Sequence, residues 1–273
     1  MGKTFIFNYN KNRFGYSCSV DIPQFCIIRK EEKMKNVLIT GANKGIGFEM
    51  AKQMAESGYF VFLGSRDKRK GIDAVTKLNG LGVSNVATIE IDVTDINSIR
   101  RAKRELETKV EALDILINNA GIGGERPQNA SGIDLENLRK VFETNFFGVI
   151  QTTQQFIGLL MESSEPRIVN VSSEVGSLTV QSNPAWKQYD NAKLTAYASS
   201  KTALNAFTVM LAYEFRDTNL KINSITPGFT ATDLNQFKGP QTAEQGARAI
   251  IKYAIAPEGP TGKFFKEEGE IPW

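Results

Sequence analysis

The chain has 273 residues, a formal net charge of +3 and 41% hydrophobic residues, which is enough for one α/β domain with a large core. The small net charge gives no argument for nucleic-acid binding. The complete lack of histidine excludes a Ser-His-Asp triad, a His-ligated metal and a histidine general base. Proton chemistry would therefore fall to Tyr, Lys and carboxylates, and we expect no metal.

No apolar run approaches the ~20 residues that a membrane span requires, so we expect no membrane partner. Cys18 and Cys26 are the only cysteines and fit a reduced, cytoplasmic setting. Residues 1–33 contain no long periodic segment and no apolar core of 7–15 residues, so we expect no secretory signal. A transit peptide is only weakly supported, because Asp21, Glu31 and Glu32 are acidic. We expect residues 1–33 to be a poorly ordered N-terminal extension or the product of a mis-assigned start, with the domain formed by residues 34–273.

The first periodic segment, residues 35–40, is a continuous apolar run typical of a buried parallel strand. A turn with the spacing G-x-x-x-G-x-G follows, and then a helical pattern over residues 48–57. Gly41, Gly45 and Gly47 would let backbone N–H groups approach a pyrophosphate at the helix N-terminus. A purely structural turn is the alternative, but the position between the first strand and a helix favours cofactor binding.

The second predicted strand, residues 59–63, ends in a basic turn. Dinucleotide-binding folds place an acid here to hold a ribose 2′-OH, whereas a 2′-phosphate calls for arginine. Arg66 after this strand and Lys44 in the glycine turn therefore favour NADP over NAD. The alternative is that Asp67 caps the next helix and that residues 68–70 form a solvated face.

The third and fourth strands are predicted at residues 86–91 and 113–117, with a helix over 96–110 between them. Asp95 is a candidate N-cap for that helix. Asp92 follows the third strand, and Asn119 and Gly121 follow the fourth. Because ligands of open α/β sheets bind at the carboxyl ends of the strands, these strand ends describe one crevice.

The second half of the chain continues the alternation. Helices are predicted over residues 134–160, 196–216 and 242–256, and strands over 167–171, 220–225 and, as a final edge strand, 263–265. The pattern predicts an α/β fold: a single-domain, Rossmann-type, doubly wound parallel sheet with helices on both faces.

Tyr197 and Lys201 are four residues apart on a predicted helix, so they share one helix face. A free tyrosine has a pKa of roughly 10, and a nearby cation favours the phenolate. The pair would give a proton donor and acceptor usable near neutral pH. Alone, this spacing is also common on ordinary helix surfaces.

Several motifs follow one another in order along the chain. They are Thr40-Gly41-Ala42-Asn43-Lys44-Gly45-Ile46-Gly47, Asn118-Asn119-Ala120-Gly121, Asn145 in Thr144-Asn145-Phe146-Phe147-Gly148, Ser173 in Asn170-Val171-Ser172-Ser173, Tyr197 with Lys201, and Pro227-Gly228-Phe229-Thr230-Ala231-Thr232. Together with the predicted elements, these motifs resemble the short-chain dehydrogenase/reductase family over residues 34–273. Within that family the chain is most similar to the NADPH-dependent carbonyl reductases, at Asn43-Lys44, Arg66-Asp67, Asn145-Phe146-Phe147-Gly148 and residues 262–273.

The resemblance implies a catalytic set of Asn145, Ser173, Tyr197 and Lys201. Tyr197 would protonate the developing alkoxide and Ser173 would donate a hydrogen bond to the same oxygen. Lys201 would lower the pKa of the phenol and hold the nicotinamide ribose, and Asn145 would order a water that links Lys201 to solvent. Since strands alternate faces, only one of Ser172 and Ser173 can face the cleft, and the resemblance selects Ser173.

The resemblance also implies a set of NADP(H) contacts, in which Thr230 and Thr232 have the alternative of being simple turn residues. The implied contacts are Gly41, Asn43, Lys44, Gly45, Ile46, Gly47, Arg66, Asp92, Val93, Asn119, Tyr197, Lys201, Pro227, Gly228, Thr230 and Thr232.

The implied function is an NADPH-dependent oxidoreductase that reduces the carbonyl of a small aldehyde or ketone to an alcohol. The mix of Trp186, Tyr189 and Phe229 near the expected nicotinamide face favours a largely apolar substrate. One alternative is a 3-oxoacyl-carrier-protein reductase, although residues 176–196 carry no clear basic run for an acidic carrier. Another is a non-enzymatic NADP(H) sensor or scaffold, which should lack one of the four catalytic residues. The substrate's identity and the choice between monomer and homo-oligomer stay open.

Overall fold

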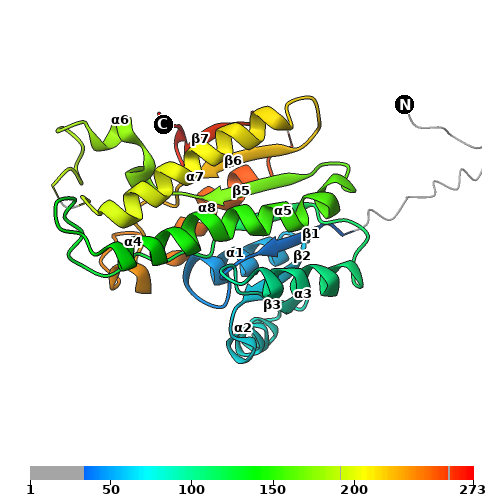
Figure 1. Cartoon of the computed structure of the whole chain (residues 1–273). Coiled ribbons are helices and arrows are strands. Elements are labelled where there is room, and N and C mark those ends of the chain that lie inside the picture. Colours follow the sequence, from blue (N-terminus) through cyan, green and yellow to red (C-terminus); the bar gives the residue numbers. More distant parts are fainter. Residues whose placement is uncertain (1–33, 191, 258) are drawn as a thin grey trace, which may run out of the picture. The chain divides into compact units, whose positions relative to one another are not determined.

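The computed structural model of the protein describes residues 34–190, 192–257 and 259–273. The expectations for residues 1–33, including those for Cys18 and Cys26, lie outside the described residues. In the described part, the chain forms one sheet with helices packed on it (Figure 1). No helix in this part is both long and apolar enough to cross a membrane.

The sheet has eight strands in the order β3-β2-β1-β4-β5-β6-β7-β8. β1 to β7 pair in parallel, which confirms the predicted Rossmann-type architecture. The strands are β1 (Asn36–Ile39), β2 (Phe60–Ser65), β3 (Val86–Glu90), β4 (Ile115–Asn118), β5 (Arg167–Val171), β6 (Lys221–Ile225), β7 (Lys263–Lys266) and β8 (Gly269–Glu270).

The edge of the sheet differs from the prediction. The strand expected at the edge is β7, but the chain turns back after Lys266 and adds the short strand β8. Antiparallel pairing joins Phe265 to Glu270 and Lys266 to Gly269. A two-residue strand is too short to show a readable alternation, so no sequence pattern indicated it.

Helices cover both faces of the sheet (Figure 1). One face packs against α1 (Gly45–Glu56), α2 (Lys68–Gly80) and α8 (Ala243–Ala254). The other packs against α3 (Ile96–Glu107), α5 (Gly148–Met161) and α7 (Thr195–Glu214). Successive strand residues separate accordingly, because Val37 and Ile39 lie in the first core and Leu38 in the second, as the period of two requires.

The long helix expected over residues 134–160 is interrupted. It consists of α4 (Leu135–Phe142), a π-helical turn over Glu143–Phe147, and α5. Single π-helical turns are frequent at functional sites. Here the turn carries Asn145, which is fully buried. Gly148 begins α5 at a close approach, since a Cβ there would lie 2.9 Å from the Val93 carbonyl oxygen.

Two predicted helix caps are present. The Asp67 carboxylate accepts the backbone N–H of Lys70 at 3.1 Å, and the Asp95 carboxylate accepts that of Asn97 at 2.9 Å. Asp67 therefore has the helix-capping role that was the alternative interpretation of this turn. Capping by Asp67 leaves the preceding residue, Arg66, available to the site.

The strand order reverses between β1 and β4, and this is where open α/β sheets form their crevice. The Thr40 hydroxyl joins the two strand ends there. It accepts the backbone N–H groups of Asn119 and Ala120, both at 3.0 Å. The Asn119 side chain in turn donates to the carbonyl oxygens of Thr40 and Gly41 at 2.9 and 3.0 Å. The ends of β1 and β4 are thus bonded together at the base of the crevice.

Candidate active site

Two adjoining pockets lie at the carboxyl ends of the strands. We call the first, of about 490 Å³, the glycine-loop pocket, and the second, of about 570 Å³, the tyrosine pocket. Ile46, Asn119 and Thr232 line both pockets. Of the other residues predicted for the site, the glycine-loop pocket contains Gly41, Asn43, Lys44, Gly45, Gly47, Arg66, Asp92 and Val93, and the tyrosine pocket contains Ser173, Tyr197, Lys201, Pro227, Gly228 and Thr230.

The glycine turn has the backbone that a phosphate cradle requires. Gly41 and Gly45 have φ angles of +64° and +57°, which residues with a Cβ rarely adopt. A Cβ on Gly47 would lie 2.6 Å from the Gly41 carbonyl oxygen and 2.7 Å from the Asn119 amide nitrogen. No side chain caps α1 at Lys44, so N–H groups of the first helical turn are available to an anion. These features fit a dinucleotide pyrophosphate.

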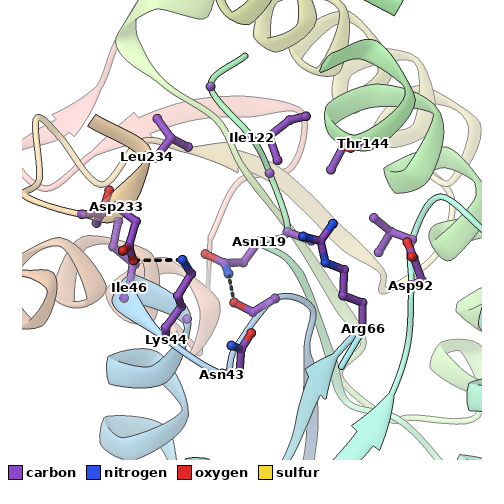
Figure 2. A pocket seen from close by; sticks show the side chains of 18 of the residues that line it. Asn43, Lys44, Ile46, Arg66, Asp92, Asn119, Ile122, Thr144, Asp233 and Leu234 are labelled. Atoms are coloured by element: carbon purple, nitrogen blue, oxygen red, sulfur yellow. Dashed lines mark hydrogen bonds and ion pairs between the residues drawn. The ribbon is translucent and has the colours of Figure 1, made fainter. Parts of the chain in front are cut away.

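The two cations expected at a 2′-phosphate differ in their surroundings. Figure 2 shows Arg66 reaching from the end of β2 into the glycine-loop pocket. Lys44 instead turns to Asp233, with the ammonium nitrogen 3.0 Å from a carboxylate oxygen (Figure 2). Both of these side chains are more than half exposed. Within the described residues, Arg66 has no ion-pair partner, so it is the cation that is free to meet an anion.

Ser173 and Ser172 separate as the alternation of the strand requires. The Ser172 hydroxyl is buried and donates to the Asn205 side chain of α7 at 2.7 Å. The Ser173 side chain makes a hydrogen bond with Tyr197, which lies in the first turn of α7. The two hydroxyls of Ser173 and Tyr197 therefore lie together in the tyrosine pocket.

The electrostatics of the pair Tyr197 and Lys201 differ from the expectation. Burial raises the pKa of the Tyr197 phenol to about 12, and the hydrogen bond with Ser173 opposes this only in part. Burial lowers the pKa of Lys201 to about 8. The Lys201 ammonium donates to the Val171 carbonyl oxygen at 2.7 Å and lies 5.8 Å from the centre of the Tyr197 ring. Desolvation, which is the larger effect here, keeps the phenol protonated at neutral pH while Lys201 stays mostly charged.

Asn145 lies behind the pockets and lines neither of them. Its carbonyl oxygen accepts the backbone N–H of Ile122 at 2.8 Å, and its amide donates to the Ile122 carbonyl at 2.9 Å and to the Ser200 hydroxyl at 3.1 Å. A Cβ on Gly121 would lie 3.3 Å from the Asn145 oxygen and 3.7 Å from the Lys201 nitrogen. Both groups thus approach the same glycine, which brings Asn145 to the neighbourhood of Lys201.

Some lining residues were not expected from the sequence. They come mainly from the loops after β4 and β6, and their place at the carboxyl ends of these strands is the signal that could have indicated them. The unexpected residues of the glycine-loop pocket include Ile122, Gly123, Gly124, Thr144, Asp233 and Leu234, and those of the tyrosine pocket include Arg126, Glu174, Gln188, Asn235 and Lys238.

The aromatic residues expected around the substrate are only partly in place. Trp186 and Phe229 line the tyrosine pocket. Tyr189 does not line it, and the Lys193 ammonium lies 3.9 Å from the centre of the Tyr189 ring. Charged side chains such as Arg126 and Glu174 also line the pocket, which is therefore less apolar than we expected.

A parallel sheet whose order reverses at a glycine-rich turn, beside a pocket that holds serine, tyrosine and lysine, defines a Rossmann-type oxidoreductase. The model of the family described as short chain dehydrogenase matches residues 35–243. The chain belongs to this family, as the resemblance of its motifs predicted.

Curated relatives and solved structures agree with this assignment. The chain is 30% identical to (+)-neomenthol dehydrogenase of Capsicum annuum, over 86% of this chain and 96% of that protein. It is 32% identical to salutaridine reductase of Papaver bracteatum, over 85% and 94%. The structure of NADPH-bound carbonyl reductase from chicken fatty liver matches with a TM-score of 0.76 at 26% identity, over 88% of this chain and 100% of that one.

Proposed function

We propose that the protein is an NADP(H)-dependent reductase that converts the carbonyl group of a small aldehyde or ketone to an alcohol, with Tyr197 as the proton donor. The observation that carries this proposal is that Ser173, Tyr197 and Lys201 line one pocket, which adjoins the glycine-loop pocket. A substrate oxygen placed between the two hydroxyls would meet both donors. Relatives named as reductases and dehydrogenases support the same class of reaction.

The reduced nicotinamide, when bound, supplies the hydride. Tyr197 gives its phenolic proton to the substrate oxygen, and its pKa of about 12 means that this proton is present at neutral pH. The Ser173 hydroxyl donates a hydrogen bond to the same oxygen as negative charge develops on it. The positive charge of Lys201 stabilises the phenolate that the proton transfer leaves behind.

Lys201 and Asn145 have supporting parts in this proposal. Lys201 donates one of its three N–H groups to the Val171 carbonyl oxygen, so two stay available for a ribose hydroxyl and a water. Both amide hydrogens of Asn145 are already used, which leaves a lone pair on its oxygen to accept from that water. The water would return a proton to Tyr197 through Lys201.

The preference for NADP(H) rests on Arg66, which within the described residues is the cation without a partner in the glycine-loop pocket. Solved relatives with bound NADPH or NADP support this preference. A hydrogen bond to a charged group is worth roughly 1.5–3 kcal/mol, which is about a 10- to 150-fold change in affinity. Arg66→Ala should therefore weaken NADPH binding by that factor and leave NADH binding unchanged.

Lys68→Ala is the matched control for Arg66→Ala, because Lys68 is exposed two residues further on and lines neither pocket. Titration of both variants with NADPH and NADH, followed by cofactor fluorescence, makes the comparison. Equal affinity of the unmodified protein for the two cofactors would contradict the assignment of Arg66 to a 2′-phosphate.

The reaction itself is tested by NADPH oxidation with a panel of quinones, aldehydes, diketones and acyl thioesters. Turnover of aldehydes or ketones that is lost in Tyr197→Phe is the expected result. Turnover restricted to acyl-carrier thioesters would support the alternative of a 3-oxoacyl-carrier-protein reductase. Cofactor binding without turnover of any carbonyl would support the alternative of a sensor, although all four catalytic residues are present.

A further inference from the structure

The N-terminus of α7, which carries Tyr197, is capped by a residue from a distant loop. Leu194 occupies the N-cap position and cannot accept a hydrogen bond through its side chain. Gln128 takes over this role. Its backbone carbonyl accepts the N–H of Thr195, and its side-chain oxygen accepts the N–H of Tyr197, both at 3.2 Å. The backbone of Tyr197 is thereby fixed to the loop that follows β4.

The amide nitrogen of the Gln128 side chain bonds to the wall between the two pockets. This nitrogen donates to the Gly123 carbonyl oxygen at 2.7 Å. Gly123 lines both the glycine-loop pocket and the tyrosine pocket. Gln128 itself lines neither pocket and is 3% exposed, so it can touch neither substrate nor cofactor directly. One buried amide thus joins the pocket wall to the backbone of the proposed proton donor.

A second buried amide makes a parallel connection. The Ser200 hydroxyl donates to the Tyr197 carbonyl oxygen at 2.7 Å and accepts from Asn145, which binds both backbone groups of Ile122. Ile122 and Gly123 are adjacent, so the two connections close into one ring of hydrogen bonds. In this ring, the N–H of Tyr197 is held by Gln128 and its C=O by Ser200.

We propose that Gln128 is a positioning residue, which sets the place of the Tyr197 hydroxyl relative to the wall shared by the two pockets. This inference rests on the proposed function of Tyr197. A displacement of about 1 Å at a reacting group can cost on the order of 100-fold in rate. Without Gln128, two partly buried polar groups, the Tyr197 N–H and the Gly123 carbonyl, lose a partner, and the first turn of α7 is free to shift.

The test compares Gln128→Leu, which keeps the size of the side chain and removes both bonds, with Asn129→Ala as the control. Asn129 is the exposed neighbour, and within the described residues its side chain has no hydrogen bond. For Gln128→Leu we expect kcat to fall by about 10- to 100-fold while the KM for NADPH stays within about twofold. In the Tyr197→Phe background, where no phenolic proton remains, Gln128→Leu should cause little further loss.

Gln128→Glu adds a readout that a merely structural role would not move. An ionised glutamate can still accept from Tyr197 but cannot donate to Gly123, whereas the protonated acid can do both. The kcat of this variant, relative to the unmodified protein, should therefore recover as the pH is lowered through the pKa of the new carboxyl group. A pH profile parallel to that of the unmodified protein would contradict the proposal.

Hydrogen–deuterium exchange of the segment around residues 195–201 tests the ring independently of turnover. Faster exchange there in Gln128→Leu, with the melting temperature little changed, is expected. The unmodified protein could turn over no carbonyl while Gln128→Leu still showed faster exchange than the unmodified protein. That result would contradict the proposed function but support the ring of hydrogen bonds. Unchanged exchange, a kcat within twofold of the unmodified value, or equal losses with Tyr197 present and in the Tyr197→Phe background would overturn the role of Gln128.

Discussion

Tyr197 differs from an ordinary surface tyrosine by its burial and by the Ser173 hydroxyl beside its own. Tyr197→Phe removes one oxygen and keeps the ring, so packing should survive while proton donation is lost. General acid catalysis is typically worth about 10²- to 10⁴-fold in rate. We expect kcat for carbonyl reduction to fall by that factor with NADPH binding intact, as steady-state kinetics and cofactor fluorescence would show. Near-full reduction by Tyr197→Phe would mean that the proton comes from another group.

The two adjacent serines should have opposite effects when each is changed to alanine. Ser173→Ala removes the hydroxyl in the tyrosine pocket and should lower kcat with little change in stability. Ser172→Ala leaves the buried Asn205 oxygen without its donor, which costs roughly 1–3 kcal/mol of stability, while kcat should change little. Urea unfolding and kinetics on the same preparations separate the two roles, and a reversed pattern would show that the serines have been exchanged.

At this scale the sequence identified residue types and their spacing, but not their partners. The motif indicated Tyr197, Lys201 and Ser173, all of which the fold brings to one pocket. It did not indicate that burial raises the pKa of the phenol, with only partial opposition from Ser173. Nor did it indicate Gln128, whose bond to Tyr197 joins residues 69 positions apart. Such pairings depend on the folded backbone and leave no local pattern.

Among the elements, the junction of β1 and α1 has no room for an added methyl group at Gly47. Gly47→Ala would place a methyl group 2.6 Å from the Gly41 carbonyl oxygen, so the glycine turn must shift. We expect a lower melting temperature and weak binding of either cofactor. Gly80→Ala at the end of α2 is the control, because the space around Gly80 is open and alanine favours helix. The melting temperature of Gly80→Ala should equal that of the unmodified protein or be slightly higher.

The loop after β6 is held to the glycine turn by the exposed ion pair of Lys44 and Asp233. Exposed pairs of this kind contribute about 0.2–1 kcal/mol. If a cofactor phosphate competes with Asp233 for Lys44, Asp233→Asn should tighten NADPH binding by no more than about fivefold, and NADH binding should stay the same. Calorimetric titration checks this, with Glu268→Gln as the control at another exposed pair. A weaker affinity for NADPH would show that the pair supports the site instead.

Helices and strands could be predicted from the sequence where the segment itself has a clear hydrophobic pattern. Continuous apolar runs ended by glycine or a short polar residue indicated the positions of β1 to β6 within a few residues. The π-helical turn at Glu143–Phe147 was hidden, because it lies inside an unbroken helical pattern and differs only in its hydrogen bonding. The short helix α6 (Leu178–Gln181) was hidden by its length.

For the whole molecule, the buried Lys201 makes stability depend on pH. Its pKa is about 8 in the folded protein and 10.5 as the ordinary value. Between these values the unfolded chain binds the proton and the folded protein does not, so the free energy of unfolding should rise with pH, by at most roughly 1.4 kcal/mol per pH unit. Below about pH 8 the cost of burying the charge is fully present.

Urea unfolding at a series of pH values from about 7 to 10 would measure this rise, and Lys201→Met should abolish it. Tyr197 acts with the opposite sign, since its raised pKa lowers stability only above its ordinary value of 10.0. The window between about pH 8 and 10 therefore isolates the lysine. An identical pH dependence in Lys201→Met would show that the group responsible lies elsewhere.

The Thr40 hydroxyl, which bonds to two N–H groups of the opposite strand end, has a consequence for how the crevice deforms. Thr40 is 1% exposed, so separating the ends of β1 and β4 would leave buried polar groups without a hydrogen-bond partner. The wall made by β1 and β4 is therefore stiff, whereas the opposite wall is fastened by an ion pair at the surface. We therefore expect ligands of different shape to be accommodated by movement of the loop after β6, while the glycine turn between β1 and α1 keeps its position.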